Sequence, residues 1–150
     1  MKLFEAIFPP RIPMPEIDRA PPGAQWHGIR PSASAKSVKA HLADKDGEIT
    51  NERGVLRYKR DRDYLVEHAP GNAAVVDRET FKRTYRLRGD GSFQKRTDVT
   101  YRYFQLPHAV MVRTAEGPQR AEPNDWIVEG LHGEIWPVRE NIALTLYEIT

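Results

Sequence analysis

The sequence of 150 residues contains no cysteine, which excludes disulfide frameworks, thiolate zinc sites and cysteine nucleophiles. It also has no apolar run near the ~20 residues that a membrane-spanning helix requires, and residues 1–8 are too short for a secretion signal. We therefore expect a cytoplasmic protein that does not associate with a membrane. A chain of this length suits one ordinary domain or two very small packed modules.

Catalytic and metal-binding signatures are missing as well. None of the five histidines belongs to a His-Glu-x-x-His pattern, and no serine stands in a Gly-x-Ser-x-Gly turn. Gly89-Asp90-Gly91 is not followed by the lysine and helix of a phosphate-binding loop. The sequence predicts no metal site, no nucleotide site and no cofactor.

Charge is nearly balanced over the chain but unevenly distributed along it. The 23 Lys and Arg against 21 Asp and Glu give a formal net charge of +2, far from the basic excess typical of nucleic-acid-binding proteins. Residues 53–88 hold ten bases and five acids, net +5, whereas residues 113–148 hold three bases and seven acids, net −4. We expect these two stretches to attract each other.

Seven of the twelve prolines fall within residues 1–31. Because proline fixes φ and has no amide donor, this segment is predicted to form neither a regular helix nor a central strand. We therefore interpret residues 1–35 as an extended, proline-rich arm. The arm is either a polyproline ligand for an aromatic groove or, as we favour, a tail that lays its apolar side chains across the domain surface. Those side chains are Phe4, Ile7, Phe8 and Ile12.

From Lys36 onward the chain is predicted to repeat with a period of 62 residues. Residues 63–67, Asp-Tyr-Leu-Val-Glu, match residues 125–129, Asp-Trp-Ile-Val-Glu. Further matching pairs are Gly71 and Gly133, Val76 and Val138, and Tyr85 and Tyr147. We therefore predict a first module at 36–88, an exposed and mobile linker at 89–98, and a second module at 99–150.

Each module is predicted to contain short strands, a hairpin, a short helix and a terminal strand, so the fold class is α+β with strands dominating. Asp77 is placed to cap the first helix, whereas Arg139 at the matching position cannot cap the second. The hairpins join 64–67 to 73–76 and 126–128 to 135–138, and the helical turns follow at 77–81 and 139–144. Further strands are expected at 37–43, 48–50, 54–60, 99–105, 109–114 and 118–121.

The second module carries an extended motif. Residues 123–128 read Pro-Asn-Asp-Trp-Ile-Val, residues 133–138 read Gly-Glu-Ile-Trp-Pro-Val, and Tyr147-Glu148 follows near the end. In these residues the sequence resembles the small phage- and prophage-encoded proteins named for a PGDYG motif, and the first module resembles them more distantly. The resemblance implies a small α+β module and a connection to mobile elements, but no established enzyme chemistry.

Three positions depart from this motif. Asn124 replaces the motif glycine, which is tolerable in a left-handed conformation because asparagine is the next best residue there. Arg62, at the matching position of the first module, predicts a turn that is built differently. Ala143 stands where the family usually has phenylalanine, whereas the first module retains Phe81.

The predicted binding residues lie on the second hairpin and on a basic segment. They are Asp125, Trp126, Glu129, His132, Glu134, Trp136, Arg57 and Arg60. Around the hairpin, acids and an imidazole could perform acid/base chemistry, or a Trp-walled acidic pocket could hold a cation or a sugar. We favour a structural interpretation, in which Asp125 caps its own turn, Glu134 binds a backbone amide and Trp126 joins the core.

Residues 53–62 interleave bases with Tyr58 and are the best candidate for contact with a nucleic acid. Asp61 and Asp63 interrupt the segment, and strand alternation divides its bases between two faces. A solvated strand edge is therefore the favoured interpretation.

The leading functional hypothesis is a non-enzymatic accessory protein of phage or prophage type that recognises a macromolecular partner, with another protein as the favoured partner. One alternative is a nucleic-acid-binding protein that uses residues 53–62. The other is a small hydrolase or transferase, which requires Asp125, Glu134 and His132 to converge on an open pocket.

Overall fold

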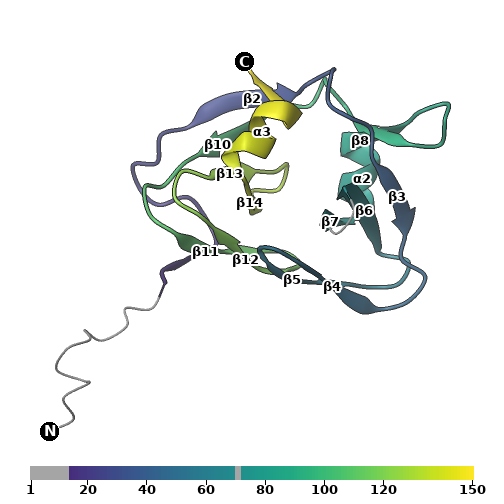
Figure 1. Cartoon of the computed structure of the whole chain (residues 1–150), viewed down its shortest axis with the longest axis horizontal. Helices are drawn as coiled ribbons and strands as arrows, with labels where there is room; N and C mark the ends of the chain where they lie inside the picture. Colours follow the sequence, from purple (N-terminus) through teal and green to yellow (C-terminus); the bar gives the residue numbers. More distant parts are fainter. Residues whose placement is uncertain (1–13, 70–71) are drawn as a thin grey trace, which may run out of the picture.

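The computed structural model describes residues 14–69 and 72–150, and its fold is α+β with strands dominating, as predicted (Figure 1). The arm contains β1 (Glu16–Ile17) and β2 (His27–Pro31). The first half contains β3 (Lys39–Leu42), β4 (Gly47–Asn51), β5 (Gly54–Tyr58), β6 (Asp63–Ala69), β7 (Asn72–Asp77), α2 (Arg78–Thr84) and β8 (Tyr85–Leu87). After β9 (Phe93–Lys95), the second half contains β10 (Tyr101–Phe104), β11 (Val110–Thr114), β12 (Gly117–Ala121), β13 (Trp126–Glu129), β14 (Ile135–Val138), α3 (Glu140–Leu146) and β15 (Tyr147–Ile149).

The two halves contain the same elements in the same order, from β3 to β8 and from β10 to β15. The six further strands are present, with ends one or two residues from their predicted positions. The Asp77 carboxylate accepts a hydrogen bond from the Thr80 amide at 3.1 Å and so caps α2, whereas Arg139 makes no such bond to α3. The duplication itself stays a prediction, which this equal order supports.

The second half is built on a five-stranded sheet in the order β14-β13-β10-β2-β15. Its fourth strand, β2, comes from the arm, and Ile29 lies opposite both Tyr101 and Ile149. The prediction that residues 1–31 form no central strand is therefore wrong. The run from Gly23 to Arg30 contains no proline, and Pro31 comes after the last residue of β2 that is paired with β10.

The first half has the matching arrangement. Its sheet has the order β3-β6-β7, Phe93 of β9 bridges to Val38 beside β3, and β9 pairs with β8. Thus β2 comes before the first half in the sequence but lies in the sheet of the second half. β9 comes before the second half in the sequence but packs against the first half. We call this reciprocal arrangement the strand exchange.

The strand exchange corrects the prediction of an exposed, mobile linker at 89–98. Within it, Phe93 packs against the apolar cluster that contains Val66 and Phe81. Gln94 is only 8% exposed, and its Nε2 donates a hydrogen bond to the Ala33 carbonyl at 3.0 Å. The turn residues before Phe93 suggested a linker, but the burial of Phe93 places it and the next two residues in a strand.

The described part of the arm belongs to the second half. Residues 16–17 run parallel to β11, and the Met111 amide donates a hydrogen bond to the Pro15 carbonyl. Ile17 and Trp26 pack on an apolar cluster that includes Phe104 and Ile127. The predicted contacts of Phe4, Ile7, Phe8 and Ile12 lie outside the described residues.

The interiors of the two halves are packed differently. In the first, Phe81 stacks between Tyr64 and Tyr85, with ring centroids 4.0 and 4.6 Å apart. In the second, Ala143 is fully buried at the matching place, and Tyr103 stacks on Trp126 at 3.8 Å instead. The change from phenylalanine to alanine is therefore compensated by an aromatic ring from the sheet.

Backbone contact joins the halves where β5 passes beside β12 (Figure 1). The Arg57 amide donates to the Glu116 carbonyl at 2.9 Å, and the Arg120 amide donates to the Arg53 carbonyl at 2.7 Å. Such close approach requires glycine: a Cβ on Gly117, whose φ is +145°, would lie 2.5 Å from the Val55 carbonyl oxygen. Gly54 meets β12 in the same way.

Charge contributes little to this junction. Among the ion pairs of the described residues, one joins the first half to the second: Arg139 Nε lies 3.4 Å from Glu52 Oε1. The Glu52 side chain is 62% exposed. An exposed pair of this kind is worth about 0–1 kcal/mol. The expected attraction between the basic and acidic stretches is thus a minor contribution beside backbone contact and strand exchange.

We predict that Gly117→Ala destabilises the protein by about 1–3 kcal/mol, because alanine disfavours the positive φ and its methyl group would clash with the Val55 carbonyl. Urea unfolding followed by circular dichroism measures this loss. Gly89→Ala is the matched control, since a Cβ there meets nothing within 4 Å, and it should change stability by less than about 0.5 kcal/mol. Equal effects of the two substitutions would show that the β5–β12 contact is not tight.

Candidate functional site

The second hairpin places the predicted acid/base residues at its opposite ends. Trp126 pairs with Val138 at one end of β13, and Glu129 pairs with Ile135 at the other. Asp125 therefore stands at the start of the hairpin, whereas His132 and Glu134 stand in its turn. The structure does not bring these three side chains together around one pocket.

Asp125 has the structural role that we favoured. It is 5% exposed, and its Oδ2 accepts hydrogen bonds from the Glu122 amide at 2.8 Å and from the Arg139 guanidinium. Asp63 in the first half, 1% exposed, likewise accepts the Lys59 amide at 2.8 Å. Both aspartates close the turn before their hairpin.

The turns themselves differ in the way the sequence suggested. Asn124 has a φ of +67°, so the left-handed conformation expected at this motif position is confirmed. In the first half the left-handed residue is Asp61, with a φ of +60°, rather than Arg62. The first turn is therefore shifted by one residue, which explains why arginine is tolerated.

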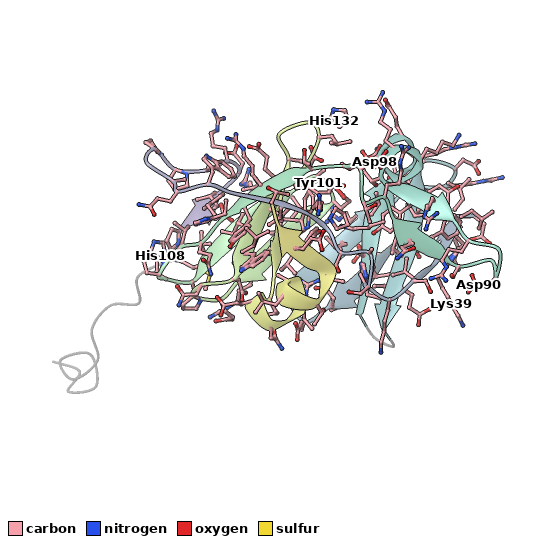
Figure 2. All side chains as sticks on the ribbon, turned by 90° about the horizontal axis from the view of Figure 1, so that it is seen from above. Lys39, Asp90, Asp98, Tyr101, His108 and His132 are labelled. Atoms are coloured by element: carbon pink, nitrogen blue, oxygen red, sulfur yellow. The ribbon has the colours of Figure 1, made fainter. Side chains whose placement is uncertain are left out.

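The remaining hairpin residues make local contacts. Glu134 Oε2 accepts a hydrogen bond from the His132 amide at 2.9 Å, as expected of a residue that ties its own turn. Glu129 accepts from Arg102 Nε at 2.7 Å across the sheet. His132 and His108 lie at separate edges of the molecule in Figure 2, so these two imidazoles share no site.

The basic segment does not form a purely cationic surface. Arg57 is exposed on β5, opposite Glu48 of β4. Arg60 Nε lies 3.3 Å from Asp61 Oδ2, and Arg62 pairs with Asp63 at 3.2 Å. Acids thus stand beside the bases that were expected to contact a nucleic acid, which favours the solvated strand edge.

Trp136 lies beside a cation, but the cation is Lys95 of the same chain. Four rings surround its Nζ atom, with centroids at 5.0 Å for Tyr147, 5.6 Å for Tyr101, 5.8 Å for Trp136 and 5.9 Å for Tyr85. Nζ also donates a hydrogen bond of 2.7 Å to the Tyr147 hydroxyl oxygen. We call these four rings the aromatic cage.

The aromatic cage is assembled by the strand exchange. Tyr85 begins β8 of the first half, whereas Tyr101, Trp136 and Tyr147 belong to the second-half sheet. Lys95 enters from β9, opposite Tyr85 in the register with β8. Figure 2 shows Tyr101 in the middle of the molecule, between the ends marked by His108 and by Lys39 with Asp90. The cage therefore contains rings from both halves.

The surroundings of Lys95 favour the charged form of its side chain. Burial alone lowers the pKa of a lysine, but here the oxygens of Tyr147, Tyr85 and Tyr101 outweigh it and raise the pKa of Lys95 above its usual value. Burial raises the pKa of Tyr101 to about 12. The cage thus places four aromatic rings around the Lys95 ammonium group, an arrangement stabilised by cation–π attraction.

Two cavities are candidates for a small-molecule site. One, of about 20 Å³, adjoins Lys95 and His68 and has room for about one water molecule. The other is an open depression of about 390 Å³ whose wall consists of charged side chains of both signs. They are Asp61, Arg62, Asp77, Arg78, Glu79 and Lys82. The first is far too small for a typical small-molecule ligand, and the second lacks the mostly apolar, enclosed lining of such a site.

Glu116, in the turn between β11 and β12, is the described carboxylate with the most strongly raised pKa. Burial raises the pKa of Glu116 to about 7, and the nearby charges of Asp63, Asp77 and Glu134 act in the same direction. Within residues 14–69 and 72–150, no three carboxylates or histidines are arranged to hold a metal ion. The raised pKa therefore reflects the crowded junction between the halves.

The two matching helices present different surfaces to solvent. On α3, Ile142 is 41% exposed and Leu144 is 62% exposed. On α2 the matching positions are Thr80 and Lys82, and an ion pair between Arg83 and Glu79 adds to its polar surface. α3 thus exposes two apolar side chains on its two flanks, either side of the buried Ala143, where α2 has polar ones, and its outermost positions are the polar Asn141 and Thr145.

Comparison with family models, with curated proteins and with solved structures found no match for this chain. The resemblance to the PGDYG-motif proteins accordingly stays a prediction from the sequence. Of the helices that the structure describes, none has the length and apolar character needed to cross a membrane.

Sequence reasoning missed Lys95, because it placed that residue in a linker, and it assigned no role to the exposed residues of α3. A signal for the first was present in the apolar Phe93 two residues earlier, which favours a strand over a loop. A signal for the second was the substitution of Thr80 and Lys82 by Ile142 and Leu144 in the aligned helices.

We predict that Glu116→Gln stabilises the protein at pH 8 by about 1–3 kcal/mol and has little effect at pH 4. Because the pKa of Glu116 is about 7 in the folded chain and 4.5 without burial, the folded state binds the extra proton between these values. Its contribution to stability is therefore lost as the pH rises from 4.5 to about 7.

Urea unfolding at both pH values measures the effect of Glu116→Gln. Glu48→Gln removes the same charge from an exposed position and is the control, with no pH-dependent gain expected. A Glu116→Gln variant that is no more stable than the parent at pH 8 would contradict a buried, crowded carboxylate.

Proposed function

We propose that this protein is a non-enzymatic recognition protein that binds a protein partner through the exposed apolar surface of α3. The observation that carries the proposal is the exposure of Ile142 and Leu144 at positions where the matching helix has polar side chains. Large apolar side chains left in water on both flanks of one helix can contact a partner that wraps around that helix.

The end of the chain extends this surface. Ile149 on β15 is 65% exposed, and it shares a sheet face with its register partner Ile29. Ile29 belongs to the apolar cluster against which α3 packs through Ala143. Exposed apolar side chains therefore occur both on α3, as Ile142 and Leu144, and on the face of the sheet against which α3 packs, as Ile149. A partner that buries Leu144 and Ile149 gains about 25 cal/mol for each Å² of apolar surface removed from water.

The two alternative functions have less support. A hydrolase or transferase needs Asp125, Glu134 and His132 to converge, whereas the hairpin separates them. A nucleic-acid-binding strand needs a continuous basic face, whereas Arg57 stands opposite Glu48 and Arg60 is paired with Asp61. Protein recognition requires neither a catalytic cluster nor a basic face.

A phage or prophage origin and a cytoplasmic location are finer parts of this proposal. The motif residues 123–128 support the first, because Asn124 takes the left-handed conformation that a motif glycine would favour. The absence of cysteine from the sequence is typical of proteins that do not depend on an oxidising compartment.

The double variant Ile142→Thr with Leu144→Lys gives α3 the residues of α2 and should abolish partner capture. The tagged full chain is used to capture proteins from a phage-carrying bacterial lysate, and bound proteins are compared by quantitative mass spectrometry. A partner should be retained by the parent and lost by at least ~10-fold with the double variant, a difference of about 1.4 kcal/mol or more.

Lys82→Ala with Arg83→Ala alters the matching surface of α2 and should leave this capture unchanged. Circular dichroism must show that each variant is folded. The proposal fails if the parent captures nothing that the α3 variant loses, or if the α2 variant loses the same proteins to the same extent.

A further inference from the structure

We propose that the aromatic cage is an internal cation site selective for a primary alkylammonium group, and that this chain fills it with its own Lys95. This inference is independent of the α3 surface. It assigns a ligand class to Tyr85, Tyr101, Trp136 and Tyr147, which hold the cation at their common centre.

The chemistry of the cage selects an alkylammonium ion. All four ring centroids lie within 6 Å of Nζ, and among the ion pairs of the described residues none involves Lys95. Aromatic faces attract an organic cation, whereas the phenol hydroxyls of the cage are not the carboxylate and carbonyl oxygens that replace the water shell of a metal ion. The Tyr147 hydroxyl accepts an N–H, which favours a primary ammonium group.

The cage walls do not depend on Lys95 for their position. Tyr85 stacks on Phe81 at 4.6 Å, and Tyr101 and Tyr147 belong to a buried cluster with Trp126. The strand that carries Lys95 is fixed separately, by Phe93 in the first-half core and by the hydrogen bond from Gln94 to Ala33. Shortening the Lys95 side chain should therefore leave a vacant site with its rings still in place.

Occupancy of the site is coupled to the contact between the halves. Tyr85 comes from the first half and the other three rings from the second, so a bound cation attracts both. An empty cage loses this attraction and leaves a gap between the rings that water can enter. A cation supplied from solution should restore the contact without a covalent link to the chain.

The test uses the full chain with Lys95→Ala, which removes three carbons and the ammonium group. The probe is n-propylammonium chloride, which has the same atoms. We expect Lys95→Ala to lower the melting temperature by about 6–12 °C and ~100 mM propylammonium to restore about 3–5 °C of it. A variant that is unfolded alone should recover its far-ultraviolet circular dichroism on addition of the probe.

Three controls distinguish a cation site from general effects. 1-Propanol has the same length without the charge, sodium chloride gives the same ionic strength, and the parent protein has a filled cage, so none should reproduce the rescue. Lys45→Ala removes an exposed lysine that does not line the cavity beside Lys95, and this variant should not respond to propylammonium. Tyr147→Phe in the Lys95→Ala background removes the acceptor and should weaken the rescue.

The proposal is overturned if propylammonium fails to stabilise or refold Lys95→Ala, or if 1-propanol does so equally well. It is also overturned if the parent shows the same shift, since the effect would then not come from the vacated cage. Lys95→Met keeps an unbranched side chain but removes the charge. A Lys95→Met variant as stable as the parent would likewise overturn the proposal, because the rings would then not be stabilised by the charge.

Discussion

The strand exchange is the constraint on which the rest of the structure depends. β15 takes its place in the five-stranded sheet only because β2, from the other end of the chain, pairs with it and with β10. Ile29 is completely buried there, in the cluster with Trp126 and Tyr147. In return, β9 supplies Phe93 to the core of the first half. Neither half is complete without a segment that precedes the other.

This constraint explains where the unusual contacts occur. β9 carries Lys95 to the boundary between the halves, and the rings around it come from both sides. The glycines at β5 and β12 allow a second, backbone contact between the halves. With the halves joined in this way, the internal contacts leave Ile142 and Leu144 of α3 exposed. The surfaces that hold the chain together and the surface proposed to bind a partner are therefore different ones.

Local sequence signals predicted local structure well and long-range placement poorly. The hairpins, the Asp77 cap and the left-handed Asn124 follow from turn chemistry and alternation within a few residues. The structural roles of Asp125 and Glu134 were expected for the same reason. The position of β2 was not predictable from proline content, because its partners lie at the other end of the chain. Likewise, nothing near Lys95 in sequence indicates three of the four rings that surround it.

The most direct test of this account is differential scanning calorimetry of the whole chain. Because β2 precedes the first half but lies inside the sheet of the second, and because the aromatic cage and the β5–β12 contact also join the halves, we expect one transition with a calorimetric to van't Hoff enthalpy ratio of about 1. Two resolved transitions, or a ratio near 2, would show that the halves are independent modules and would contradict the strand exchange as the basis of the fold.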